Sequence, residues 1–196
     1  MNYKMLPEGY ELLRSIDLQK DRRLALLVNG LSLGIAIVMV ICALPFVPFS
    51  TFISIWSPSL FDVLRPLLLL PALLVYVVTH ELIHGFYMKR YSGVKPKYGF
   101  SGLYAYAGSE AFFARRSYLI ISLAPVILWG VLLMILNFAL PVSCFWFIYI
   151  IQIMNISGAA GDFYVSLYMS RLPHTILIQD SGVKMDVYIL VEKTKA

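Results

Sequence analysis

Four long apolar segments constrain the fold of this chain more than any other feature of its sequence. Each is close to the roughly 20 residues that a helix needs to cross the hydrocarbon of a bilayer. Of all residues, 60% are hydrophobic and 14% are charged, whereas a soluble domain has about 25% charged residues. The sequence therefore predicts an all-α, polytopic membrane protein with a single domain over residues 1–196. The predicted spans are residues 24–44, 65–88, 117–140 and 144–169.

The distribution of Lys and Arg predicts the orientation of these spans. Nearly all of them lie in the N-terminal segment, in the connection between the second and third spans, and in the tail at residues 171–196. Because positive charge stays on the cytoplasmic side, both termini and that connection are expected to be cytoplasmic. The net charge of +5 is thus explained by the Lys and Arg residues that orient the spans in the lipid bilayer, and no nucleic-acid partner is expected.

Outside the spans, the sequence predicts one surface helix and two small cytoplasmic β-hairpins. Residues 2–23 are expected to form a solvated or surface-lying helix, because Leu12, Leu13 and Ile16 can share one apolar helix face. Alternating polar and apolar residues on both sides of short turns predict the hairpins. Their strands are expected at residues 97–100 and 103–107, and at residues 175–179 and 183–190.

The second span contains the motif H-E-x-x-H, formed by His80, Glu81 and His84. Residues four apart on a helix face nearly the same way, so both imidazoles can bind one metal ion. This pair suits a tetrahedral Zn²⁺, and Glu81 can act as general base on a zinc-bound water. Because a charge at mid-bilayer costs about 2.5–3.5 kcal/mol, a functional role for these residues is favoured.

Asp162 is predicted to supply the third ligand. With the flanking residues left out, it is the only charged residue besides Glu81 within the four spans. His80 lies nine residues before Lys89, and Asp162 lies nine before Arg171. Since the second and fourth spans run in the same direction, these two side chains are expected at nearly one depth. Two histidines and one aspartate would leave the fourth zinc position open for water.

Three neighbouring residues have open or structural assignments. Asn155 lies two helical turns before Asp162 on the same face. It is expected either to hydrogen-bond the substrate backbone or the developing oxyanion, or to serve in helix packing. Tyr76 and Tyr87 are expected to be packing or interface aromatics.

Three sequence motifs resemble those of a known family. They are HELIHG at residues 80–85, SLAP at residues 122–125, and Asn155 followed by SGAAGD at residues 157–162. With them, the chain resembles the "Putative zincin peptidase" family of small bacterial membrane proteins, which is akin to the site-2 protease class of intramembrane metalloproteases. The resemblance covers the chain from the second span to the tail hairpin.

The resemblance implies a zinc cofactor held by His80, His84 and Asp162, with Glu81 as the base. It also implies a multi-pass protein of the bacterial cytoplasmic membrane. Two features depart from the site-2 protease pattern: the order is Gly-Asp in place of Asp-Gly, and no proline follows Asn155. The resemblance therefore supports a metal site in this chain more strongly than it supports protease activity.

The expected function is that of an intramembrane zinc metalloendopeptidase, which hydrolyses peptide bonds of membrane-protein or peptide substrates near the cytoplasmic face. One alternative is a zinc-binding protein without protease activity, either a scaffold or a transporter, although an inactive relative would be expected to lose Glu81. Another is a metal-dependent hydrolase of non-peptide substrates. A purely structural role would pair His80 and His84 with carbonyl groups, and it leaves Asp162 unexplained.

Overall fold

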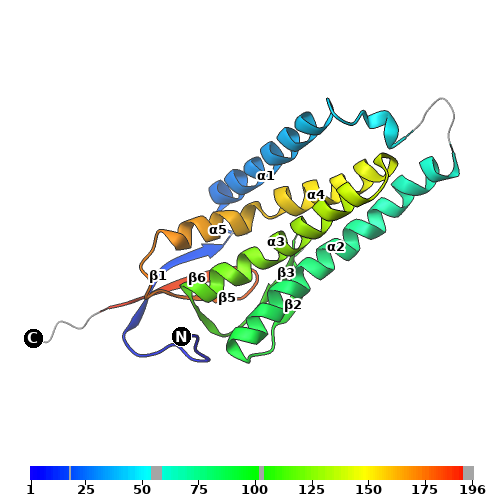
Figure 1. Ribbon diagram of the computed structural model, residues 1–196. Helices are drawn as coiled ribbons and strands as arrows, with labels where there is room; N and C mark the ends of the chain where they lie inside the picture. Colours follow the sequence, from blue (N-terminus) through cyan, green and yellow to red (C-terminus); the bar gives the residue numbers. More distant parts are fainter. Residues whose placement is uncertain (18, 54–58, 102–103, 192–196) are drawn as a thin grey trace, which may run out of the picture. The chain divides into compact units, whose positions relative to one another are not determined.

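Figure 1 shows a computed structural model of the chain, which describes residues 1–17, 19–53, 59–101 and 104–191. Helices make up most of the described chain, and six strands accompany them. The helices are α1 (Arg22–Ala43), α2 (Leu60–Ser92), α3 (Arg115–Ala139), α4 (Phe145–Gly158) and α5 (Ala160–Ser170), with the short 3-10 helices η1 (Phe49–Thr51) and η2 (Val142–Cys144).

In the part of the chain that the structure describes, four helical segments are long and apolar enough to cross a membrane. They correspond to the four predicted spans, with two differences at the boundaries. The fourth segment is divided at Ala159 into α4 and α5. The second begins at Leu60, so that Pro66 and Pro71 lie inside α2. A capping box explains this early start, because Ser59 and the Asp62 carboxylate are hydrogen-bonded to each other at the helix N-terminus.

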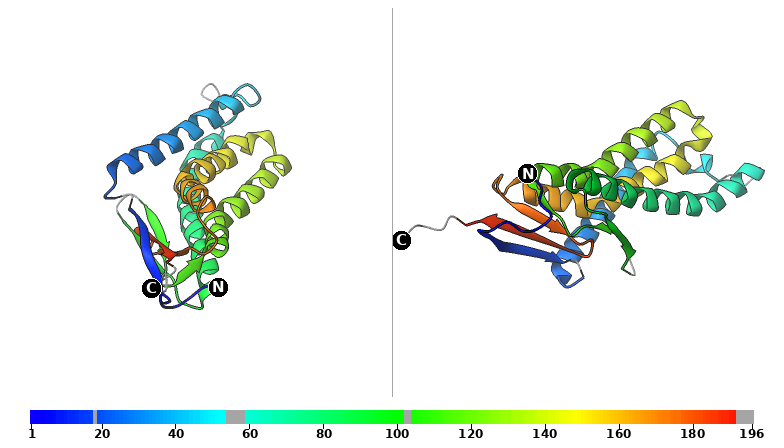
Figure 2. Two further views of the ribbon diagram at one scale, coloured as in Figure 1. Left: turned by 90° about the vertical axis from the view of Figure 1, so that its left-hand side faces the viewer. Right: turned by 90° about the horizontal axis from the view of Figure 1, so that it is seen from below.

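Four of the strands form one antiparallel sheet with the order β1-β6-β5-β4. Strands β6 and β1 run side by side in both views of Figure 2. The predicted tail hairpin is present as β5 and β6, but the predicted N-terminal surface helix is wrong, because that segment forms β1 and pairs with β6. The strands are β1 (Tyr10–Asp17), β4 (Phe112–Ala114), β5 (Leu177–Asp180) and β6 (Lys184–Leu190).

The other two strands, β2 (Lys97–Phe100) and β3 (Ala105–Gly108), form the predicted hairpin in the long connection. Its turn includes residues 102 and 103, which lie outside the described residues. Tyr106 of β3 packs against Gly182 in the turn between β5 and β6, where an added Cβ would lie 2.1 Å from the Tyr106 ring. Gly182 also has a φ of +87°, which glycine adopts without strain.

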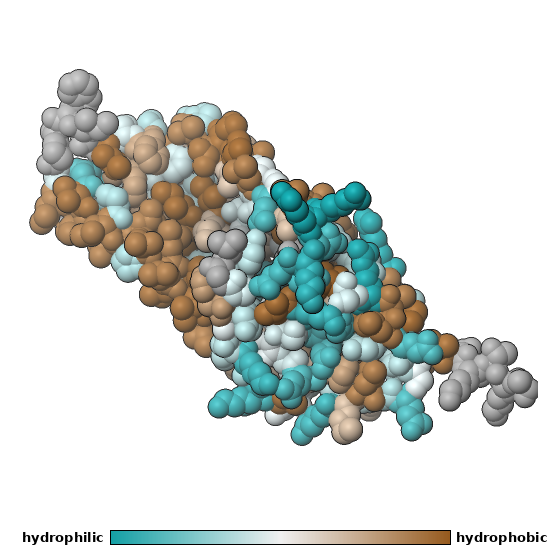
Figure 3. Space-filling view, turned by 180° about the vertical axis from the view of Figure 1, so that it is seen from behind, coloured by the Kyte–Doolittle hydropathy of each residue, from teal (hydrophilic) through white to brown (hydrophobic). Residues whose placement is uncertain are grey.

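The contacts within the chain define two compact units. Unit 1 comprises Met1–Leu27, Glu81–Pro125 and Asp162–Ala196, and it holds all six strands. Unit 2 comprises Val28–His80 and Val126–Gly161, and among its described residues the regular secondary structure consists of helices joined by short turns. On the face that Figure 3 shows, hydrophilic side chains are grouped together and hydrophobic side chains form broad continuous areas. Exposed apolar side chains of this kind are compatible with contact with lipid.

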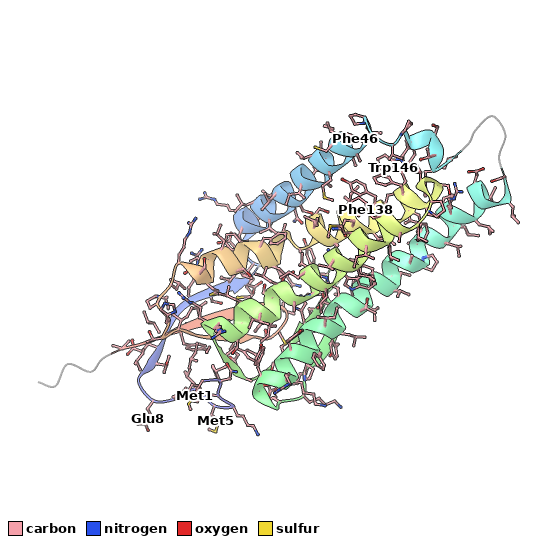
Figure 4. All side chains as sticks on the ribbon, in the orientation of Figure 1. Met1, Met5, Glu8, Phe46, Phe138 and Trp146 are labelled. Atoms are coloured by element: carbon pink, nitrogen blue, oxygen red, sulfur yellow. The ribbon has the colours of Figure 1, made fainter. Side chains whose placement is uncertain are left out.

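The core of unit 2 consists of aromatic and aliphatic side chains from α2, α3 and α4. Tyr76, Leu133, Ile148 and Ile151 form one buried cluster. Trp146, labelled in Figure 4, donates its indole N–H to carbonyl groups in the connection after α1. This hydrogen bonding satisfies the polar atom of a large buried aromatic side chain.

Candidate metal centre

Helix α2 has two opposite faces, and its histidines lie on the buried one. Tyr76, His80, His84 and Met88 follow one another at intervals of four residues, and each is less than 10% exposed. The opposite face is a stripe of exposed apolar side chains that includes Leu74, Val78, Leu82 and Phe86. The helical repeat thus turns the H-E-x-x-H histidines away from the exposed apolar surface of α2.

Helix α3 determines that Nδ1 of His84 carries a proton. This atom lies 2.8 Å from the backbone carbonyl oxygen of Ile121. Because a carbonyl oxygen only accepts hydrogen bonds, Nδ1 is the donor, and the neutral form of this ring would have its lone pair on Nε2. That Nε2 atom lies 3.6 Å from Oδ1 of Asp162. His84 therefore presents its metal-binding nitrogen toward the predicted third ligand.

Asp162 lies in the first turn of α5, which begins after the break at Ala159. The hydroxyl group of Ser122 donates to its Oδ1 atom at 3.3 Å, and the Ser166 hydroxyl in turn lies 3.2 Å from that of Ser122. Ser122 and Ser166 are buried. The carboxylate is thus oriented by a serine pair, as outer-shell partners orient the ligands of metal sites.

His80 lies one turn before His84 on the same unbroken helix. Its Nδ1 atom lies 3.0 Å from the hydroxyl oxygen of Tyr76. One ligand atom from each of His80, His84 and Asp162 lies within 4.8 Å of the others, and among the described residues this is the one such group of potential metal ligands. The structure therefore brings together the three predicted ligands, whose role as ligands stays a prediction.

Glu81, the predicted base, is half-buried and lies beside the β2–β3 hairpin. Its carboxylate accepts a hydrogen bond from the backbone N–H of Ala107 in β3. In the same unit, β2 approaches the helix at Gly85, where an added Cβ would lie 2.1 Å from the Tyr98 hydroxyl. The glycine after the motif therefore allows the hairpin to lie close to Glu81.

Asn155 and Tyr76 have contacts that differ from those expected of a substrate-binding residue and a packing aromatic. Asn155 is fully buried, and its amide group bonds the Tyr76 hydroxyl and the carbonyl oxygen of Val126. The ring of Tyr76 packs in the core as expected, but its hydroxyl group also bonds His80. The oxyanion role of Asn155 stays a prediction.

Sequence reasoning did not single out a second pair of polar groups, Tyr118 and Asp180. The Tyr118 hydroxyl donates to Oδ2 of Asp180 at 2.6 Å, and the Gly182 N–H donates to Oδ1 at 2.8 Å. Burial raises the pKa of the Asp180 carboxyl, and these two hydrogen bonds oppose part of that rise. The charge of the Asp162 carboxylate raises the pKa of Asp180 further, so Asp180 belongs to the surroundings of the candidate centre.

The donor set itself fits a zinc ion. Two imidazoles and one carboxylate are ligands that zinc takes in hydrolytic sites, where a fourth position stays open. Each of the three candidate ligands also has a hydrogen-bonding partner behind it: Tyr76, Ile121 or Ser122. Such partners are the usual support of a metal site.

The chain combines helices long and apolar enough to cross a membrane with an H-E-x-x-H pair and a nearby aspartate, and this donor set is that of zinc-dependent hydrolases. The chain belongs to the "Putative zincin peptidase" family, whose profile matches residues 73–177. The matched segment includes His80, His84, Glu81 and Asp162. Comparisons with curated proteins and with solved structures gave no match.

Proposed function

We propose that this protein is a membrane-embedded zinc metalloprotease that hydrolyses peptide bonds of membrane proteins near the cytoplasmic face. The observation that carries the proposal is the convergence of His80, His84 and Asp162, with their ligand atoms within 4.8 Å. Membership in a zincin family supports peptide hydrolysis as the reaction. A bound zinc ion would polarise the scissile carbonyl and lower the pKa of a water molecule toward about 7.

Glu81 is the proposed general base. It follows His80 directly in α2, and its half-buried carboxylate is held by the N–H of Ala107. In the proposed reaction, Glu81 accepts a proton from the attacking water and passes it to the leaving nitrogen of the peptide. The presence of this carboxylate favours an enzyme over an inactive relative.

The β2–β3 hairpin is the proposed binding site for the substrate backbone. A membrane helix hides its carbonyl groups in its own hydrogen bonds, so a substrate must become extended before cleavage. Ser101 and Tyr104 are hydrogen-bonded across the hairpin, and antiparallel pairs alternate between bonded and non-bonded positions. By this alternation, the N–H group of Ala105 faces away from β2, as does that of Ala107, which already donates to the Glu81 carboxylate. An extended substrate could therefore add along this edge, beside Glu81.

The proposed topology places both termini on the cytoplasmic side of a bacterial cytoplasmic membrane. The distribution of Lys and Arg supports this orientation. The sheet gives independent support, because β1 precedes the first span, β6 follows the last, and the two strands are paired.

The decisive experiment compares membranes from cells that carry either the wild type or Glu81→Gln. Peptide N-termini that appear only with the wild type, and that map within or beside membrane spans of other proteins, would support the proposal. Identical sets of N-termini in the two membranes, with both proteins expressed at equal levels, would contradict it.

A further inference from the structure

The side-chain amide of Asn155 has only one favourable orientation. Its Nδ2 atom lies 3.0 Å from the carbonyl oxygen of Val126. In the reversed orientation, Oδ1 would face that carbonyl oxygen, and two acceptors would oppose each other. Because Asn155 is 0% exposed, an unsatisfied amide would be costly there. Nδ2 therefore donates to Val126, and Oδ1 faces the Tyr76 hydroxyl at 3.2 Å.

This orientation determines where the proton of the Tyr76 hydroxyl lies. The amide oxygen of Asn155 can only accept, so Tyr76 must donate its single proton to it. The same hydroxyl oxygen lies 3.0 Å from Nδ1 of His80. With its proton already engaged, the hydroxyl can only accept from His80. His80 must therefore carry its proton on Nδ1, which leaves the lone pair on Nε2.

The three side chains are held in place by the core of unit 2. Tyr76 is 4% exposed, and it packs against Leu133, Ile148 and Ile151. Its ring also lies edge-on to that of Trp129, with centroids 5.4 Å apart. In such a buried environment the hydroxyl cannot exchange its partners for water, so the hydrogen bonds have a fixed direction.

We propose that Asn155 and Tyr76 form a relay that fixes the Nδ1–H form of His80 and so presents its Nε2 atom to the metal ion. Asn155 is then a positioning residue, which acts through Tyr76 and does not touch the substrate. The relay rests on the proposed function in one respect, namely that His80 binds zinc. In this relay, Asn155 of α4 determines which nitrogen of His80 carries the proton, as the Ile121 carbonyl of α3 does for His84.

The first test measures zinc affinity by competition with a chelator, using the purified full-length protein. Tyr76→Phe removes only the hydroxyl group, and Asn155→Leu removes the amide at nearly constant volume. Each should weaken zinc binding by about 10–100-fold, the usual effect of losing such a partner. The double variant should bind zinc only slightly more weakly than whichever single variant binds it more weakly, because both changes break one relay.

Tyr149→Phe is the matched control for this experiment. It removes a tyrosine hydroxyl in the same unit, where that group donates to the carbonyl oxygen of Met39 at 3.0 Å. Zinc affinity should stay within twofold of the wild type. An equal loss in Tyr149→Phe, or unchanged affinity in Tyr76→Phe and Asn155→Leu, would overturn the relay.

The second test uses ¹⁵N NMR of the metal-free protein to determine which ring nitrogen of His80 carries the proton. The chain has only three histidines, so their signals can be assigned with His84→Ala and His174→Ala. At about pH 8, where an ordinary histidine is neutral, His80 should show the Nδ1–H form in the wild type and a mixture of forms in Tyr76→Phe. A proton on Nε2 in the wild type would refute the relay.

The two tests separate this inference from the proposed function. If the wild type binds no zinc, the metalloprotease proposal fails, while the NMR measurement still decides whether the relay exists. If the wild type binds zinc and His80→Ala does not, but Tyr76→Phe matches the wild type in both measurements, only the relay fails.

Discussion

The Nε2 atom of His84 lies 3.6 Å from Oδ1 of Asp162, and two consecutive residues of α3 hold these groups from behind. The carbonyl oxygen of Ile121 accepts from His84, and the Ser122 hydroxyl donates to Asp162. Helix α3 contributes no candidate ligand of its own, yet it orients two of them. The geometry of the centre therefore depends on a helix that lies outside the H-E-x-x-H motif.

Zinc content is the first prediction. The wild-type protein should contain about one zinc ion per chain, whereas His80→Ala and Asp162→Ala should lose it, because two ligands rarely retain zinc in a site of this type. Elemental analysis of tag-free protein measures this. His174→Ala is the control, since His174 is exposed and bonds Arg115. Full zinc content in Asp162→Ala would contradict the ligand set.

The Ser122 hydroxyl should tune metal affinity without being a ligand. Ser122→Ala removes the hydrogen bond to Asp162 and should weaken zinc binding by about 10-fold, within the usual range for such partners. Ser170→Ala removes a hydroxyl that donates to the carbonyl oxygen of Leu167 in its own helix, and this variant should bind zinc like the wild type. Equal affinity in the two variants would argue against a role for Ser122.

Glu81→Gln should separate metal binding from catalysis. Glutamine has nearly the same shape and cannot act as a base at neutral pH, so zinc content should stay unchanged. Cleavage of a membrane-protein reporter should fall by about 10²–10⁴-fold, the usual contribution of general base catalysis. The measurement is single-turnover cleavage with enzyme in excess, and a rate near that of the wild type would remove Glu81 from the mechanism.

Proline in β3 should slow cleavage without affecting the metal. Ala105→Pro removes an N–H group that faces away from β2, so the β2–β3 pairing can persist while substrate pairing is weakened. Ala105→Ser keeps the N–H group and is the control. Reporter cleavage and zinc content are measured together. The edge-strand proposal is wrong if Ala105→Pro turns over substrate at the rate of Ala105→Ser.

The buried carboxyl group of Asp180 should make stability depend on pH. Because burial raises its pKa, the folded protein binds more protons than the unfolded chain between the unfolded value, about 3.9, and the raised value. The contribution of Asp180 to stability is therefore complete below that window and is lost as the pH rises through the folded-state pKa.

Asp180→Asn removes this dependence, because the amide does not titrate. We expect the unfolding midpoint of the wild type, measured relative to Asp180→Asn in the same detergent, to fall as the pH rises through the window. Thermal unfolding followed by intrinsic fluorescence measures it. A difference between the two proteins that is independent of pH, or that increases with pH, would show that the carboxyl group is not buried as described.

The membrane helices and the H-E-x-x-H face were predictable because they rest on long, regular sequence patterns. Strand β1 was not, because its pairing with β6 has a register shift between Leu12 and Arg14. A bulge of this kind interrupts the alternation that identifies a strand, and the remaining apolar residues imitate a helix face. Strand β4 has only three residues, too few for any period to show.

The outer partners of the candidate centre were only partly predictable. Tyr76 precedes His80 by one helical turn, and this spacing alone places the two side chains next to each other. By contrast, the SLAP motif includes Ser122 but does not predict its hydrogen bond to Asp162, and nothing local in the sequence marks the carbonyl oxygen of Ile121. Their positions depend on how α3 packs in unit 1, which is a property of the tertiary structure.

The pairing of β1 with β6 also determines the order in which the protein can mature. During synthesis β1 emerges before α1, and its partner β6 emerges only after α5 has been made. The sheet can therefore close only when the helices from α1 to α5 are complete, and the turn that contains Asp180 closes with it. If the chain is the proposed protease, a ribosome-bound chain that still lacks β6 would be inactive until its synthesis is complete.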